Sequence, residues 1–126
     1  MKFSESLKKN EDFKQVYKKK RSFANKYFIM YVSENGLSIN RLGISVSKKV
    51  GNSVVRHRIA RLVRESYRLN EEKFIQKKFV DESKSESNSG LDIVMVAREG
   101  AAEIRYSAVE SALLHLAGLH KILTEY

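Results

Sequence analysis

The 126-residue chain contains no cysteine, no proline and no tryptophan. The absence of cysteine excludes disulfide bonds and thiolate metal sites. The absence of proline means that turns depend on glycine, asparagine and serine. No apolar run approaches the length of a membrane span or of the hydrophobic core of a signal peptide. The sequence therefore predicts a cytoplasmic protein.

Acidic residues are scarce in one half of the chain. Residues 1–68 hold 17 basic and 5 acidic side chains, a net charge of +12, whereas residues 69–126 hold 7 basic and 10 acidic side chains, a net charge of −3. The whole chain carries +9, and its 42% of hydrophobic residues suffices for one domain with a core. A basic surface of this kind favours a nucleic acid or an acidic membrane surface as the partner.

Residue sets typical of catalysis are also missing. There is no cysteine nucleophile and no Gly-x-Ser-x-Gly motif. Asp12 and Asp92 are isolated in the sequence, and we interpret them as solvated or capping residues. His57 has no acid beside it that would orient the imidazole, although a role as general base stays open. The residues alone therefore indicate a binding protein.

The most informative stretch runs from residue 41 to residue 68. An alternating segment leads into Lys48-Lys49-Val50-Gly51-Asn52 and then into a helix that Asn52 or Ser53 can cap. The two lysines lie beside a helix N-terminus, which suits an anion. One face of the helix is predicted to be apolar and to contain Val55, Ile59, Leu62, Val63, Ser66 and Leu69.

The opposite face of this helix is almost entirely cationic. It carries His57, Arg61, Arg64 and Arg68, with Arg56 and Arg58 at its flanks. Only Glu65 relieves the repulsion, and its spacing predicts a pair with Arg61. Arginine in these positions fits phosphate, which a guanidinium can bind through two hydrogen bonds. The alternative to a phosphate-binding surface is that these residues form an ordinary solvated helix face.

The remaining elements follow from periodicity and turn signals. We predict a helix capped by Asn10 and ending near residue 19, strands at 27–32, 37–46 and 91–97, and a last helix that begins with the capping box Ser107-x-x-Glu110. The middle helix is predicted to extend to about residue 78, and residues 81–90 form a polar surface loop.

Ser22 to Asn25 is interpreted as a connection. In the strand at 37–46, Leu42, Ile44 and Val46 are expected to point inward, and Arg41, Gly43 and Ser45 outward. On the last helix, Val109, Leu113, Leu116, Ala117 and His120 are expected to face the core.

The resulting fold class is α+β. The chain is expected to form a single two-layer domain over residues 1–126, with the order helix-strand-strand-strand-helix-strand-helix. Phe13 and Tyr17 lie on one side of the first helix, and the strand at 27–32 is apolar on both faces. Such aromatic side chains either belong to the core or form a stacking surface for bases, and both interpretations stay open.

The stretch from residue 41 to residue 65 resembles the protein subunit of bacterial ribonuclease P. That family has a basic helix usually written Arg-Asn-Arg, and this chain has Arg56-His57-Arg58 there, with Ala60 where a lysine is common. Residues 8–17, 21–25 and 91–97 resemble its first helix, the following loop and its late strand. The resemblance implies a fold like a ribosomal-protein domain, with a left-handed crossover between parallel strands.

The resemblance also implies a function. The protein would bind ribonuclease P RNA and the 5′ leader of precursor tRNA, and would raise substrate and metal affinity while magnesium held by the RNA subunit supports hydrolysis. No catalytic or metal-binding residue, membrane partner or small-molecule substrate is expected in the protein itself. The residues implied to bind the catalytic RNA are Lys48, Lys49, Arg56, His57, Arg58, Arg61, Arg64 and Arg68. The residues implied to bind the leader are Phe13, Lys14, Tyr17, Ser22, Asn25 and Tyr31.

Two other functions remain possible on the sequence. A generic ribosomal or tRNA-binding domain would carry the same basic helix but would have no role in cleavage. A stand-alone metal nuclease would cut RNA without an RNA partner. A cleavage assay with the RNA subunit present or withheld distinguishes all three.

Overall fold

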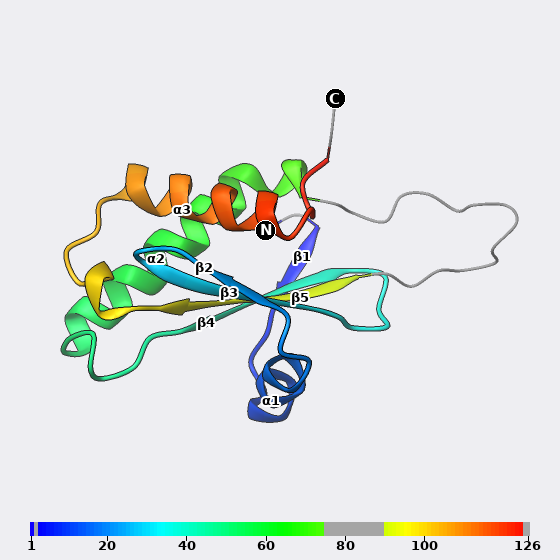
Figure 1. The fold of residues 1–126 in the computed structure, drawn as a ribbon, viewed down its shortest axis with the longest axis horizontal. Coiled ribbons are helices and arrows are strands. Elements are labelled where there is room, and N and C mark those ends of the chain that lie inside the picture. Colours follow the sequence, from blue (N-terminus) through cyan, green and yellow to red (C-terminus); the bar gives the residue numbers. More distant parts are fainter. Residues whose placement is uncertain (2, 75–89, 125–126) are drawn as a thin grey trace, which may run out of the picture.

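A computed structural model describes residues 1, 3–74 and 90–124. The elements are β1 (Ser4–Ser6), α1 (Asn10–Lys18), β2 (Ser22–Ala24), β3 (Phe28–Glu34), β4 (Asn40–Ser45), α2 (Ser53–Asn70), β5 (Leu91–Ala97) and α3 (Tyr106–Leu119), with short 3-10 helices at Glu71–Lys73 and Glu99–Ala101. All five strands join one sheet. The α2 and α3 helices cover one face of this sheet, and α1 covers the other (Figure 1).

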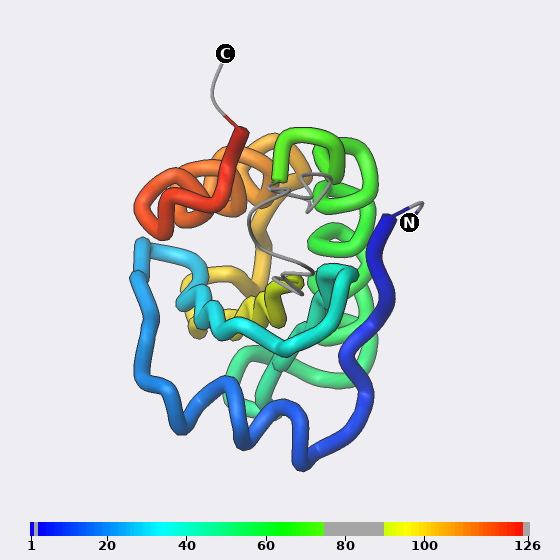
Figure 2. Tube along the Cα trace, turned by 90° about the vertical axis from the view of Figure 1, so that its right-hand side faces the viewer, coloured from blue at the N-terminus to red at the C-terminus, as the bar shows by residue number. Residues whose placement is uncertain are grey.

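The sheet is mixed, in the spatial order β1-β4-β5-β3-β2. β1, β4 and β5 run parallel, whereas β3 is antiparallel to β5 and β2 is antiparallel to β3. The parallel neighbours β4 and β5 are joined through α2. Viewed along these strands, with α2 above the sheet, the chain passes from β4 on the right through α2 to β5 on the left (Figure 2). The crossover is therefore left-handed, against the general preference for the right-handed connection.

Two separate cores hold the layers together. On the α2 and α3 side, Phe28, Met30 and Ile93 of the sheet are fully buried against Val63 and Leu113 of the helices. On the α1 side, Leu7, Val16 and Val94 form a smaller core. Among the described residues, α1 is the only helix on this side, so its aromatic residues are partly buried and partly open to solvent. Both faces of the central strand β5 are consequently covered, as its continuous apolar run predicts.

The structure corrects several expectations. The chain has two strands that the sequence did not reveal, β1 and β2. Each is three residues long and pairs at an edge of the sheet, so neither shows an alternating apolar pattern. Gly43 is buried under α1 rather than pointing outward, because both faces of β4 are covered. Leu69, expected on the apolar face of α2, is 57% exposed.

Helix boundaries also differ from the predicted caps. Asn10 is the first residue of α1 and does not cap it, because Lys9 occupies the cap position without a side-chain hydrogen bond. Ser107 lies inside α3, which begins at Tyr106, so the capping box is absent. The α2 helix ends at Asn70 instead of extending to residue 78. The predicted continuation beyond residue 74, and all but Gly90 of the predicted loop at 81–90, lie outside the described residues.

His120 is buried between α3 and the sheet, where its Nε2 atom lies 2.8 Å from the backbone oxygen of Met30. Its Nδ1 atom is buried and has no hydrogen-bond partner in the part of the chain that the structure describes, and the ring packs edge-on against Phe23, with ring centroids 4.8 Å apart. The Nε2 atom therefore carries the proton that the Met30 carbonyl accepts. Burial lowers the pKa of His120 below its ordinary value of 6.5.

This lowered pKa predicts a pH dependence of stability. Below about pH 6.5 the unfolded chain binds a proton at His120 that the folded chain does not, so the free energy of unfolding should decrease as the pH falls toward the folded-state pKa. Urea unfolding at pH 7.5 and pH 5 measures the effect. In His120→Gln, which cannot titrate, this part of the pH dependence should be lost. His115→Gln changes an exposed histidine of the same helix and should leave it intact.

Candidate nucleic-acid interface

The α2 helix presents a cationic ridge to solvent. The Asn52 side chain accepts a hydrogen bond from the backbone N–H of Val55 at 3.0 Å, which confirms one of the two predicted caps. Ile59, Val63 and Tyr67 are fully buried on the inner face of α2 and fix its orientation. The outer face carries the residues that we call the α2 ridge: Arg56, His57, Arg58, Arg61, Arg64 and Arg68.

Arg61 and Arg64 are the freest cations of the α2 ridge. Both side chains are exposed, and neither forms an ion pair within the described part of the chain. Lys48, Lys49 and His57 are likewise exposed and unpaired among the described residues. Unpaired guanidinium groups on one helix face repel one another, and a polyanion would relieve that repulsion.

The predicted pair between Arg61 and Glu65 is wrong. Glu65 instead pairs with Arg68, one turn further along α2, and this guanidinium lowers the pKa of the Glu65 carboxyl.

Two arginines at the flanks of the ridge are held by backbone oxygens of the same chain. Arg56 donates to the carbonyl of Gly51 at 2.9 Å, and Arg58 donates to the carbonyl of Ile104. Both retain further N–H groups that can bind phosphate.

A cleft lies on the other face of the sheet, between α1 and β4. It encloses about 440 Å³ and is lined by Asn10, Phe13, Lys14, Tyr17, Ile44 and Ser45. The structure thus brings together three of the residues predicted for leader binding, Phe13, Lys14 and Tyr17. Asn10, Ile44 and Ser45 were not predicted for this site. The walls combine aromatic rings with one cation, a combination that suits single-stranded nucleic acid.

The two aromatic side chains of the cleft form a connected row with Tyr31, which adjoins the cleft but does not line it. The ring centroids of Phe13 and Tyr17 are 6.3 Å apart, and Tyr17 packs edge-on against Tyr31 at 4.9 Å. All three side chains are half-buried. They therefore pack on the small core and also remain accessible, so the two interpretations left open by the sequence are compatible.

Ser22 and Asn25 occupy different places. Ser22 is the exposed partner of Tyr31 in the antiparallel pairing of β2 with β3, so it lies next to the aromatic row. Asn25 does not line the cleft. Its Oδ1 atom accepts the backbone N–H groups of Tyr27 and Phe28, at 3.1 and 2.9 Å, and so shapes the turn between β2 and β3. The geometry therefore favours Ser22 over Asn25 as a neighbour of a ligand in the cleft.

Asp12 and Asp92 are not isolated in space, contrary to their interpretation from the sequence. Arg41 bridges them, with hydrogen bonds to both carboxylate oxygens of Asp92 at 2.8 Å and a longer contact of 3.4 Å to Asp12. The hydrogen bond with Asp92 raises the pKa of Arg41. Because Asp12 belongs to α1 and the other two residues to the sheet, this network ties α1 to the strands beneath it.

Gly43 determines how closely Phe13 approaches the sheet. A Cβ atom at this position would lie 2.8 Å from the Cε1 and Cζ atoms of Phe13 and 3.1 Å from Leu7 Cδ2. In Gly43→Ala the ring must therefore move, and we expect a loss of about 1–3 kcal/mol in the free energy of unfolding, as for other overpacked cores. Urea denaturation measures this loss. Gly118→Ala is a control, because a Cβ there has no neighbour within 4 Å.

In residues 1, 3–74 and 90–124, no group of three or more histidine, aspartate or glutamate side chains is placed to hold a metal ion. Within the same residues, no helix is both long enough and apolar enough to span a bilayer.

The fold and the two surfaces define a small basic α+β domain with a cationic helix on one side and an aromatic cleft on the other. Comparison with known proteins identifies its family. The profile of the Ribonuclease P family matches residues 1–121. The ribonuclease P protein components of Lachnoclostridium phytofermentans and Alkaliphilus oremlandii are 63% and 50% identical. The matches cover 96% and 92% of this chain, and 93% and 90% of those proteins.

Solved structures agree with this result. The RNase P protein of Staphylococcus aureus superposes with a TM-score of 0.77 at 32% identity, over 94% of this chain and 97% of that one. The RNase P protein of Thermotoga maritima gives a TM-score of 0.71 at 28% identity, over 87% and 92%. The chain belongs to the ribonuclease P protein family. It is accordingly a subunit of an endoribonuclease of tRNA processing, and its partner is ribonuclease P RNA.

Some residues of these surfaces were missed by sequence reasoning. Gly43 gave a usable signal, since a glycine inside a strand often marks a close approach of another element. The bridge from Arg41 to Asp92 and Asp12 left no signal in the sequence, because it depends on the register of β4 against β5. The contact of Arg58 with Ile104 depends in the same way on how the segment before α3 packs on α2.

Proposed function

We propose that the α2 ridge, together with Lys48 and Lys49, binds ribonuclease P RNA. The support is the exposure of Arg61 and Arg64, which carry no carboxylate partner within the described residues. A folded RNA supplies the phosphates that would neutralise them, and each phosphate contact releases counterions. Binding should therefore weaken steeply as salt is raised.

We further propose that the cleft between α1 and β4 binds the 5′ leader of precursor tRNA. The row of Phe13, Tyr17 and Tyr31 offers ring faces to unpaired bases, and Lys14 lies in the cleft wall. Stacking accepts any base and contributes about 1–3 kcal/mol per base. This tolerance suits a protein that must accept leaders of many sequences.

In this proposal the protein raises affinity and the RNA subunit performs the chemistry. Magnesium held mainly by the RNA would support hydrolysis of the phosphodiester bond. The protein would raise the affinity for precursor tRNA through the leader, and thereby also the affinity for the metal ions that the bound substrate helps to hold. We place this activity in the cytoplasm, where bacterial precursor tRNAs are made.

The single observation that carries the proposal is the presence of an exposed cationic helix and an aromatic cleft on opposite faces of one sheet. The test is cleavage of precursor tRNA by the protein alone, by the RNA subunit alone, and by both together at low magnesium. We expect cleavage by the RNA subunit to be stimulated by the protein, and no cleavage by the protein alone. Binding of structured RNA without stimulation would instead favour a generic RNA-binding domain, and cleavage by the protein alone would favour a stand-alone nuclease.

A further inference from the structure

A second group of cations lies at the C-terminal end of α1 and is separate from the α2 ridge. It consists of Lys18, Lys19, Lys20 and Arg21, which we call the α1 basic end. All four side chains are exposed, and none forms an ion pair within the described residues. The positive charges suit the negative end of the helix dipole, but that effect is small and four successive cations also repel one another. Helix stability alone therefore does not account for the group.

The backbone of Lys20 makes this residue useful for a test. Its φ angle is 56°, in the left-handed region, and its N–H donates to the carbonyl of Tyr17 at 3.1 Å to close the helix. Helices commonly end in this conformation on a glycine, because a Cβ atom is crowded there. A lysine at this position is less stable than a glycine would be. Removing the Lys20 side chain should therefore not destabilise the fold.

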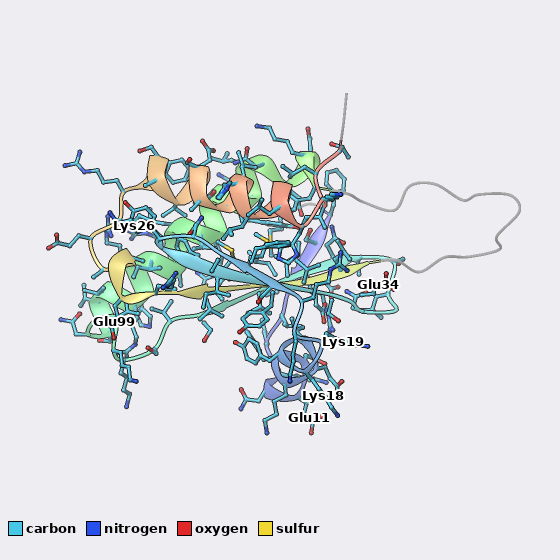
Figure 3. All side chains as sticks on the ribbon, viewed as in Figure 1. Glu11, Lys18, Lys19, Lys26, Glu34 and Glu99 are labelled. Atoms are coloured by element: carbon cyan, nitrogen blue, oxygen red, sulfur yellow. The ribbon has the colours of Figure 1, made fainter. Side chains whose placement is uncertain are left out.

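The α1 basic end lies at one end of the aromatic row. It begins directly after Tyr17, and it is followed by Ser22, the strand partner of Tyr31. The chain leaving α1 enters β2 at one edge of the sheet, whereas α2 packs over β4 near the other edge (Figure 2). Lys18 and Lys19 extend beside α1, on the side of the sheet opposite α2 and α3 (Figure 3).

We infer that the α1 basic end binds the phosphates of leader nucleotides that lie 5′ of those held in the cleft. This inference rests on the proposed function. If the catalytic RNA is bound along α2, a leader that enters the cleft from the β4 side leaves it past Tyr17 and Tyr31, where it meets the three lysines of the α1 basic end. Single-stranded RNA carries one negative charge per nucleotide, so charge complementarity extends the binding site beyond the aromatic rings.

The experiment measures the affinity of the reconstituted holoenzyme for precursor tRNAs whose leaders lengthen by one nucleotide at a time. For the unaltered protein, affinity should rise while the cleft fills and rise again as the leader reaches the α1 basic end. Lys20→Gly should retain the first rise and lose about two- to fivefold in affinity for long leaders. Its plot of log affinity against log salt should become less steep by about 0.7, the value for one phosphate contact of a single strand.

The same variant carries its own check on folding. Because glycine is favoured at this φ angle, Lys20→Gly should raise the midpoint of thermal unfolding by about 2–6 °C while it weakens binding. A loss of affinity in a more stable protein cannot be attributed to unfolding. Lys20→Arg, which keeps the charge, should bind long leaders as the unaltered protein does.

Lys121 provides a matched control in the same chain. It is an exposed lysine with φ of 59°, its N–H donates to the carbonyl of Gly118 at 3.0 Å, and it closes α3 on the other face of the sheet. Lys121→Gly removes the same charge from the same kind of position. It should give a similar rise in thermal stability and no change in affinity for any leader length.

Three results would overturn the inference. In the first, Lys20→Gly binds long leaders as well as the unaltered protein does, although Phe13→Ala still weakens binding of short ones; the proposed cleft would then stand without the extension. In the second, Lys121→Gly causes an equal loss, which would reflect net charge alone. In the third, Lys20→Gly weakens assembly with ribonuclease P RNA in the absence of substrate, which would assign these cations to the catalytic RNA. If no leader of any length gains affinity from the protein, the proposed function itself fails.

Discussion

Replacing both Arg61 and Arg64 with alanine is expected to weaken assembly with ribonuclease P RNA by at least about a hundredfold, because each loses charge-assisted hydrogen bonds worth about 1.5–3 kcal/mol. The slope of log affinity against log salt should decrease by about 2, close to the value for two phosphate contacts on a helical RNA. Titration of labelled RNA with protein at several salt concentrations measures both quantities. The free energy of unfolding should stay the same, since both side chains are exposed and unpaired within the described residues.

Arg68→Ala provides the comparison. Arg68 lies on the same ridge, but its guanidinium already pairs with Glu65, so its removal should cost the complex less than removal of either free arginine. Equal losses for Arg61, Arg64 and Arg68 would mean that only net charge matters. An undiminished affinity in the double variant would exclude the α2 ridge as the RNA-binding surface.

Removing the rings of Phe13 and Tyr17 together is expected to lower the affinity of the holoenzyme for precursor tRNA by about ten- to a hundredfold, through loss of base stacking. Affinity for mature tRNA, which lacks the leader, should not change. The measurement compares binding of the two RNAs by the reconstituted holoenzyme. Equal losses for both RNAs, or no loss for either, would contradict leader binding in the cleft.

Both rings also pack on the small core beneath α1, so the double alanine variant is expected to lose stability as well. The variants Phe13→Leu and Tyr17→Leu separate the two effects. Leucine keeps apolar contact with Leu7 and Val94 but offers no ring face to a base. If affinity follows the aromatic rings and not the unfolding midpoint, then the accessible side of the row binds the leader.

The long elements could be predicted from the sequence, and the short ones could not. The strand Leu91–Ala97 is confirmed at both ends, because a seven-residue segment with six apolar residues between turn residues is typical of a buried strand. The start of α2 is confirmed with its Asn52 cap. β1 and β2 escaped prediction because three polar or exposed residues at a sheet edge carry no periodic signal. Their hydrogen bonds depend on a neighbouring strand that is distant in sequence or follows a turn.

The same division applies to the site. Side chains that point away from a single element, such as Arg61 and Arg64, follow from helical spacing alone. Contacts between elements do not, because sequence spacing says nothing about how β4 registers against β5 or where Ile104 packs. Asp92 illustrates this limit: its neighbours in sequence are apolar, yet its carboxylate is held by Arg41 from the adjacent strand. Lys20 and Lys121 illustrate the same limit, since their left-handed backbone conformation is visible only in the structure.

The left-handed connection has one more consequence. Ile44 and Ser45, which line the cleft, continue within a few residues through Lys48 and Lys49 into the cationic helix. One short covalent segment thus links the cleft that is proposed to bind the leader to the α2 ridge that is proposed to bind ribonuclease P RNA. Under the proposed function, such a segment would act as a fixed spacer that sets the distance between the bound leader and the catalytic RNA. Lengthening the loop between Ser45 and Asn52 by one residue would change that distance while leaving both contact surfaces intact.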